Sequence, residues 1–204
     1  MPHLTFCGLD IAYDHRVLQP RPWTEAQSTW AAELLTDAPE GPVLELCAGA
    51  GHIGLGAVRD TDRALVMVDV NPAAEELSLQ NAAAHGLAER ITFRLGRMEE
   101  VLDAGERFAV IVADPPWVRS AETSRFPEDP VLAIDGGGDG LDLARTCVDL
   151  MDRHLHDGGA GLLQLGNPAQ AETIAAYAAK QTGGRLTLVE VRRFDRGVLA
   201  RLTR

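Results

Sequence analysis

The chain has 204 residues, 46% of them hydrophobic and 24% charged, which is ordinary for a soluble globular protein and enough for one α/β domain with a full core. Its formal net charge of -11 argues against nucleic acid as the main partner, because duplex binding normally requires a basic face. No apolar run reaches the length of a membrane span, no signal peptide opens the sequence, and the three separated cysteines form no CxxC pair. We therefore expect a cytoplasmic protein with no membrane segment and no metal site.

We expect residues 1–204 to form a single domain, with a lead-in and one helix in 1–40 and the core in 41–204. Residues 1–23 are expected to be irregular and to end in a stiff Pro-Arg-Pro sequence. The sequence TEAQ that follows matches a capping box, in which the Thr24 hydroxyl and the Gln27 side chain satisfy exposed amides at a helix start. The pattern therefore predicts a helix from about residue 25 to residue 36.

Strands and helices alternate along the rest of the chain. Short apolar runs predict strands at 43–46, 64–68, 91–95, 109–113 and 160–165, and helices are predicted at 72–85, 141–155 and 169–182. Asn71 and Pro72 suit the N-cap and first position of one helix, and Gly86 suits its left-handed cap. Two alternating runs, 186–193 and 198–202, predict an antiparallel hairpin. The expected fold is a doubly wound α/β sheet of seven strands, mostly parallel, with one antiparallel strand.

The loop after the first of these strands is rich in glycine. Gly49, Gly51 and Gly54 form a literal GxGxxG, and Asp69 follows at the spacing of about 20 residues that is typical of dinucleotide sites. Alone, this pattern suggests NAD as readily as another ligand. Glu45, inside the preceding strand, is badly placed beside a pyrophosphate but could face a cationic group. S-adenosylmethionine has an amino group, a sulfonium and a ribose diol and no phosphate, so Glu45 and Asp69 suit it better.

The strand at 109–113 ends in Asp114-Pro115-Pro116-Trp117. Neither proline can donate a backbone hydrogen bond, so both fix an extended turn beyond the carboxyl end of the strand. The Asp114 side chain and the Pro115 carbonyl are two acceptors for the hydrogens of a planar NH2 group, and the Trp117 ring offers a stacking face. Fixing those hydrogens aims the nitrogen lone pair at an electrophile. These four residues are the candidate catalytic group; the alternative is an ordinary turn with Trp117 in the core.

Together these motifs resemble class I S-adenosylmethionine-dependent methyltransferases. More narrowly, the chain is similar to the HemK/PrmC family, the protein-(glutamine-N5) methyltransferases that modify the Gly-Gly-Gln motif of release factors. The stretches that carry the resemblance are 17–25, 45–51, 114–117 and 129–142. It implies cofactor contacts from Glu45, Cys47, Ala48, Gly49, Gly51, Asp69, Val70, Arg97, Met98 and Asp114. It also implies substrate contacts from Arg21, Thr24 and Trp117.

Some positions depart from the family pattern. Asp114 replaces an Asn, Trp117 replaces a Tyr, and Cys47 replaces a Gly; Arg97 stands where an acid often contacts adenine, with Glu99 as the alternative acid. A carboxylate at 114 suits an amine at least as well as an amide, and D-PP-aromatic also resembles N6-adenine methyltransferases.

The sequence identifies the methyl acceptor less directly than it identifies the cofactor. Bacterial members of the family carry an N-terminal helical domain that we do not expect here, and the short relatives rely on a small zinc-binding activator subunit. We therefore expect a protein glutamine as acceptor. A small molecule is the main alternative, and a nucleic-acid amine or a non-catalytic binding protein are others.

Overall fold

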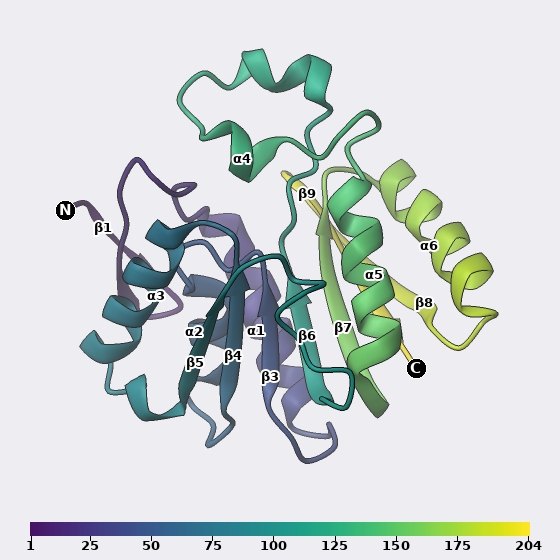
Figure 1. The fold of residues 1–204 in the computed structure, drawn as a ribbon, viewed down its shortest axis with the longest axis horizontal. Helices are drawn as coiled ribbons and strands as arrows, with labels where there is room; N and C mark the ends of the chain where they lie inside the picture. Colours follow the sequence, from purple (N-terminus) through teal and green to yellow (C-terminus); the bar gives the residue numbers. More distant parts are fainter.

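The computed structural model describes all 204 residues and is built around a seven-stranded sheet of order β5-β4-β3-β6-β7-β9-β8 (Figure 1). Its strands are β3 (Val43–Leu46), β4 (Leu65–Asp69), β5 (Ile91–Leu95), β6 (Phe108–Ala113), β7 (Leu155–Leu165), β8 (Thr187–Phe194) and β9 (Gly197–Thr203). Neighbouring strands run parallel except β9, which is antiparallel to both β7 and β8. The predicted doubly wound sheet with one antiparallel strand and a terminal hairpin is confirmed.

Helices cover both faces of this sheet. They are α1 (Glu25–Leu35), α2 (His52–Val58), α3 (Pro72–Ala84), α4 (Val131–Ile134), α5 (Asp142–His154) and α6 (Pro168–Thr182), with 3-10 turns at Pro22–Thr24, Ala88–Arg90 and Ser120–Arg125. A cluster of 26 buried hydrophobic residues joins one face to α1, α2 and α3, and a cluster of 24 joins the other to α5 and α6. Apolar side chains are therefore buried away from water on both faces of the sheet, and this burial is the main source of stability. No helix combines the length and apolar character needed to span a bilayer.

The order of the strands reverses between β3 and β6. From β3 the chain proceeds outward through β4 to β5, and it then returns to β6 and continues outward through β7. Leu46 and Ala113 are partners at the carboxyl ends of β3 and β6, so Cys47 and Asp114 follow them at the crevice between the two halves. Ligands of open α/β sheets bind at such a reversal point. The topology thus brings the glycine-rich loop and the Asp-Pro-Pro-Trp turn together.

The sequence predicted an irregular N-terminal segment, and this prediction is wrong for the first twelve residues. The segment forms an antiparallel hairpin of β1 (His3–Phe6) and β2 (Leu9–Ala12). Cys7 and Gly8 form the two-residue loop of this hairpin, and both have positive φ, 47° and 74°, as such a tight turn requires. Four-residue strands are too short for a recognisable alternation, so the pattern gave no strand signal. Phe6 and Ile11 anchor the hairpin because both are fully buried in the cluster shared with α1.

Helix α1 begins and ends close to the predicted positions, but the capping box does not form. The Thr24 hydroxyl donates to the carbonyl of Arg21 at 2.8 Å and makes no cap contact. Gln27 is fully buried, and its Nε2 donates to the carbonyl oxygens of Ala113 at 3.0 Å and Leu162 at 3.1 Å. Because these carbonyls belong to β6 and β7, Gln27 ties α1 to the two strands that carry the site, an interaction too distant in sequence to be read from a local motif.

We expect replacement of Gln27 by leucine to lower the free energy of unfolding by about 1–3 kcal/mol, since the variant leaves two buried carbonyls without their side-chain donor. Urea denaturation monitored by circular dichroism measures this loss. Gln19→Leu is a control that does not touch those carbonyls. Equal stability of wild type and Gln27→Leu would show that the two hydrogen bonds contribute nothing.

Candidate active site

Two adjoining cavities open at the carboxyl ends of β3, β4 and β6. The first, which we call the glycine-loop cavity, has a volume of about 500 Å³, and the second, the Trp117 cavity, about 830 Å³. Their shared lining residues are Val17, Leu18, Gln19, Arg21, Asp114, Pro116, Pro130 and Ala133. Asp114 therefore lies where the two cavities meet, so a group bound in either one can reach it.

The glycine-rich loop turns sharply along one wall of the first cavity. Cys47, Gly49 and Gly51 all have positive φ, at 60°, 54° and 74°. A Cβ on Gly51 would lie 2.8 Å from the hydroxyl oxygen of Ser78, so no larger residue fits there. The Ser78 hydroxyl donates to the Gly49 carbonyl at 3.0 Å, and Asn81 Nδ2 donates to the Ala50 carbonyl at 2.9 Å. Helix α3 thus holds the loop in the conformation that lines the cavity with Cys47, Ala48 and Gly49.

Asp69, at the end of β4, faces the same cavity. Its Oδ2 accepts a hydrogen bond from the Gly49 amide at 2.9 Å, and its Oδ1 accepts one from the Asn71 amide at 2.9 Å. Burial raises the pKa of this carboxyl group above its ordinary value. Each oxygen retains a further lone pair, so the fixed carboxylate can accept from two neighbouring hydroxyl groups, as a ribose diol requires.

The remaining wall of the glycine-loop cavity combines apolar and charged side chains. Val70 is 47% exposed although it is apolar, and Met98 lines the cavity beside it. Arg97 also lines the cavity, and its guanidinium pairs with Glu99 at 2.9 Å. Apolar surface next to a diol-binding carboxylate fits a nucleoside, so the residues present suit the adenosine part of S-adenosylmethionine.

Asp114 accepts no hydrogen bond from the protein, although it lies in a largely enclosed position. Burial raises the pKa of its carboxyl group to about 7. Pro115 and Trp117 line only the Trp117 cavity, and a Cβ on Gly166 would lie 2.5 Å from Trp117 Cε3, so the indole packs directly on that glycine. Gln170 Nε2 donates to the Trp117 carbonyl at 3.2 Å. The turn is thus fixed from α6, and it presents an acceptor without a protein partner.

Like Trp117, the other two predicted substrate residues, Arg21 and Thr24, lie at the cavities. Arg21 lines both, and its Nη2 pairs with Asp129 Oδ1 at 2.7 Å, so its charge joins the N-terminal segment to the loop after β6. Thr24 is buried and lines the Trp117 cavity. The loop at 118–138 contains α4, which stands above the carboxyl ends of the strands (Figure 1). Arg21 therefore lines the two cavities and also anchors the loop that stands above them.

Glu45 is not brought to either cavity, contrary to the expectation that it contacts the amino end of the ligand. Side chains alternate along β3, and that of Glu45 turns toward α2, where a Cβ on Gly54 would collide with its Oε2. Glu45 is 2% exposed, and Oε2 has no hydrogen-bond partner. Burial raises the pKa of its carboxyl group to about 8. The sequence pattern predicted that Glu45 lies on the strand, but it did not predict toward which face of the sheet its side chain points.

Because the pKa of Glu45 is raised from 4.5, the folded state holds its proton more tightly than the unfolded state does. The resulting stability is fully present below pH 4.5 and is lost as the pH rises through about 8. We expect Glu45→Gln to be stabilising relative to wild type at pH 8.5 and less so at pH 5, in urea titrations at each pH. The exposed Glu40→Gln variant is the control. An identical difference at both pH values would contradict an ionisable buried Glu45.

His52 is a cavity residue that sequence reasoning missed. It begins α2 and lines the glycine-loop cavity, and its ring packs edge-on against Phe6 at 4.7 Å between centroids. Burial lowers the pKa of the imidazole to about 3, so the ring is neutral at pH 7. Its Nδ1 has no partner within the protein. Histidines indicate a metal site from sequence only when their spacing suits metal ligands, and a single histidine at a helix start carries no such signal.

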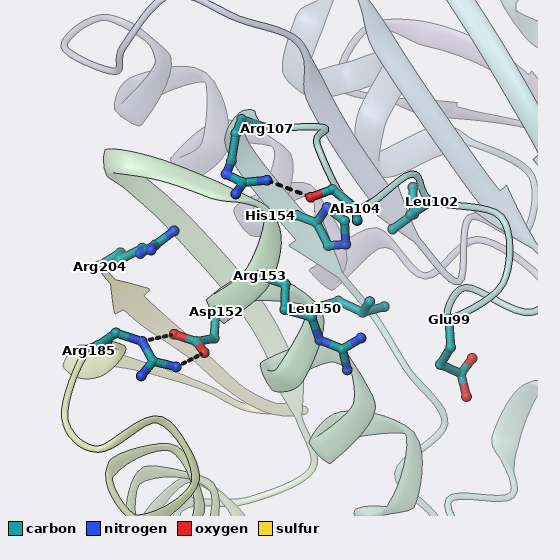
Figure 2. Close-up of a pocket in the computed structure, with 10 residues that line it drawn as sticks. All are labelled: Glu99, Leu102, Ala104, Arg107, Leu150, Asp152, Arg153, His154, Arg185 and Arg204. Carbon is teal, nitrogen blue, oxygen red and sulfur yellow. Dashed lines mark hydrogen bonds and ion pairs between the residues drawn. The ribbon is translucent and has the colours of Figure 1, made fainter.

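A third cavity, of about 520 Å³, lies near the end of α5 and is lined by four arginines. Figure 2 shows that their side chains lie apart around it. Arg185 is paired with Asp152 at 2.6 Å, and Arg107 donates to the carbonyl of Ala104 at 3.1 Å. Since these two guanidinium groups are already bound and no Ser, Thr, Cys or Lys side chain lines the cavity, the chemistry is assigned to the first two cavities.

Comparison with known proteins agrees with this geometry. The family model described as "Methyltransferase small domain" matches residues 26–128. A release factor glutamine methyltransferase of Geobacter sulfurreducens is 36% identical over 176 residues, covering 83% of this chain and 60% of that protein. One from Cereibacter sphaeroides is 32% identical over 204 residues, covering 97% and 71%. A ribosomal protein uL3 glutamine methyltransferase of Bordetella pertussis is 34% identical over 161 residues, covering 76% and 54%.

Solved structures share the fold at lower identity. The catalytic domain of hMettl16, in complex with an RNA hairpin, has a TM-score of 0.74 at 15% identity, covering 96% of this chain and 74% of that one. The N-methyltransferase NodS from Bradyrhizobium japonicum, in complex with S-adenosyl-L-homocysteine, has a TM-score of 0.60 at 18% identity, covering 90% and 88%. The chain spans 54–71% of the length of these three curated relatives and 74–88% of the two solved chains.

Proposed function

Because this chain belongs to the methyltransferase small domain family and is an S-adenosylmethionine-dependent enzyme, we propose that it methylates the side-chain amide of a glutamine in a protein. The observation that carries the proposal is the place of Asp114. It lies unbonded at the junction of a cavity that suits adenosine and a cavity lined by Pro115 and Trp117. A nitrogen held there from the second cavity would face the first.

We assign the cofactor to the glycine-loop cavity. Asp69 would accept hydrogen bonds from the ribose hydroxyls, and the turn at Gly49 would allow the ligand to approach the backbone closely. Val70 and Met98 would pack on the adenine. When bound, S-adenosylmethionine supplies a methyl group on a cationic sulfur, which is transferred as an N–C bond forms, the S–C bond breaks and one amide proton leaves to water.

The residues of the Trp117 cavity would orient the acceptor. The Asp114 carboxylate and the Pro115 carbonyl would accept the two N–H hydrogens of the amide, and Trp117 would stack on its plane. An amide nitrogen is a poor nucleophile because its lone pair is delocalised, so its orientation matters greatly. Holding two reactants in near-attack geometry can lower a barrier by about 7–11 kcal/mol in favourable cases.

A protein acceptor is supported by the relatives, whose names state that they methylate release factors or ribosomal protein uL3. A small-molecule amine is the second candidate, and it is favoured by one observation. Position 114 carries a carboxylate, which would attract an amine more strongly than an amide does.

The test is methyl transfer from tritiated S-adenosylmethionine to unmethylated bacterial release factor and to uL3, with a host lysate assayed in parallel. Label in one of these proteins, lost when its acceptor glutamine is replaced, would support the proposal. Label only in the small-molecule fraction of the lysate would favour the second candidate. Label in the protein only after lysate is added would indicate an activator subunit, which we also propose as a partner.

A further inference from the structure

Gln164 lies next to Asp114 across the sheet. Ala113 of β6 is the register partner of Leu163 of β7, so the residues that follow, Asp114 and Gln164, are neighbours at the carboxyl ends of two parallel strands. Residues at equivalent positions of adjacent parallel strands project from the same face of a sheet. Both residues line the Trp117 cavity. The topology therefore places a carboxamide side chain beside the carboxylate of the site.

The amide of Gln164 has no good hydrogen bond within the protein. The side chain is 4% exposed, and its only hydrogen bond runs from Nε2 to the carbonyl of the adjacent Leu165 at 3.4 Å, which is long for such a bond. A Cβ on Gly197 would lie 2.5 Å from Nε2, so β9 leaves just enough room for the amide. Buried amides are normally well paired. The donor of Gln164 is thus held in place but poorly used.

Three other donors near Asp114 already have protein partners. Arg21 pairs with Asp129 at 2.7 Å, and the Thr24 hydroxyl donates to a backbone carbonyl at 2.8 Å. Gln27 donates to two strand carbonyls at 3.0 and 3.1 Å. Gln164 differs from these three side chains, because its Nε2 makes a single long hydrogen bond and it lines the Trp117 cavity. Its donor is therefore available to a bound molecule.

We propose that Gln164 Nε2 donates a hydrogen bond to the carbonyl oxygen of the acceptor amide and so selects a carboxamide over an amine. Asp114 and Pro115 offer only acceptors, which recognise an NH2 group in either kind of molecule. A carboxamide also carries an oxygen, and that oxygen needs a donor. This inference rests on the proposed function, because it names how the same site distinguishes a glutamine side chain.

A double-mutant cycle between the enzyme and its acceptor tests this proposal. The enzymes are wild type and Gln164→Met, which preserves the length of the side chain and removes the donor. The acceptors are unmethylated bacterial release factor and the same protein with its acceptor glutamine replaced by methionine. Binding of each pair is measured with S-adenosylhomocysteine present, and calorimetry gives the affinity of each enzyme for S-adenosylhomocysteine alone.

We expect the preference of the enzyme for the glutamine protein to fall by about tenfold in Gln164→Met, with unchanged affinity for S-adenosylhomocysteine. Purely structural damage would weaken both acceptors equally, and an unchanged preference would overturn the proposal. If wild type instead transfers no methyl group to release factor or uL3, the proposed function itself fails. The two failures are therefore distinguishable.

Discussion

Replacing Asp114 with alanine is expected to reduce the rate of methyl transfer by about 100- to 1000-fold, the range seen when one preorganised polar group is removed from an active site. Affinity for S-adenosylmethionine should change little, because Asp114 is only one of many residues that line the cofactor cavity, and the hydrogen bond that fixes Asp69 to the glycine-rich loop does not involve it. Single-turnover transfer and calorimetric binding measure the two quantities separately. A loss of cofactor affinity as large as the loss of rate would place Asp114 in the cofactor site alone.

Asp114→Asn is the matched variant, because it retains one acceptor oxygen without a charge and restores the residue typical of the resembled family. Since burial raises the pKa of Asp114 to about 7, the wild-type carboxyl group carries a proton below that pH and cannot accept with both oxygens. Transfer by wild type should therefore rise as the pH increases through about 7. In Asp114→Asn the transfer should remain within about tenfold of the wild-type rate, and this inflection should disappear. An asparagine variant as inactive as alanine would indicate that charge is required, as for an amine acceptor.

Local sequence signals predicted the central sheet well because most of its strands are short apolar runs that end at turn-forming or helix-capping residues. The run at β6 is buried along its full length and stops at Asp114, where two prolines prevent its continuation. Asn71 accepts from the Ala73 amide as an N-cap, and Gly86 has a φ of 70° after α3. These features depend on residues that are close in the sequence, so the sequence alone predicts them.

Long-range features could not be read in this way. Gln27 bonds to carbonyls 86 and 135 residues away, which turned an apparent helix cap into a link between α1 and two strands. The face to which Glu45 points depends on strand register, and a shift by one residue inverts every side chain. Gln164 became informative only when the pairing of β6 with β7 placed it beside Asp114. The motifs thus located the site, while the register and burial determined which polar groups remain available within it.

Replacing Asp69 with alanine should weaken binding of S-adenosylmethionine by about 1.5–3 kcal/mol, the usual contribution of hydrogen bonds to a charged group. Calorimetric titration with S-adenosylhomocysteine gives this value without any need for an acceptor. The size of the effect has two sources in the structure, since Asp69 faces the cavity and also binds the Gly49 amide at 2.9 Å. The variant would lose the carboxylate and release the loop that it holds.

The variant Ser78→Ala separates these two sources. It removes the hydrogen bond from Ser78 to the Gly49 carbonyl, at 3.0 Å, and leaves the Asp69 carboxylate in the cavity. If loop support dominates, Ser78→Ala should lose affinity comparably to Asp69→Ala. If direct contact with the ribose dominates, it should lose no more than about 1 kcal/mol, the net contribution of one neutral hydrogen bond. Because the Asp69 carboxylate is charged and retains free lone pairs toward the cavity, we expect the second result, and unchanged affinity in Asp69→Ala would remove this residue from the ribose site.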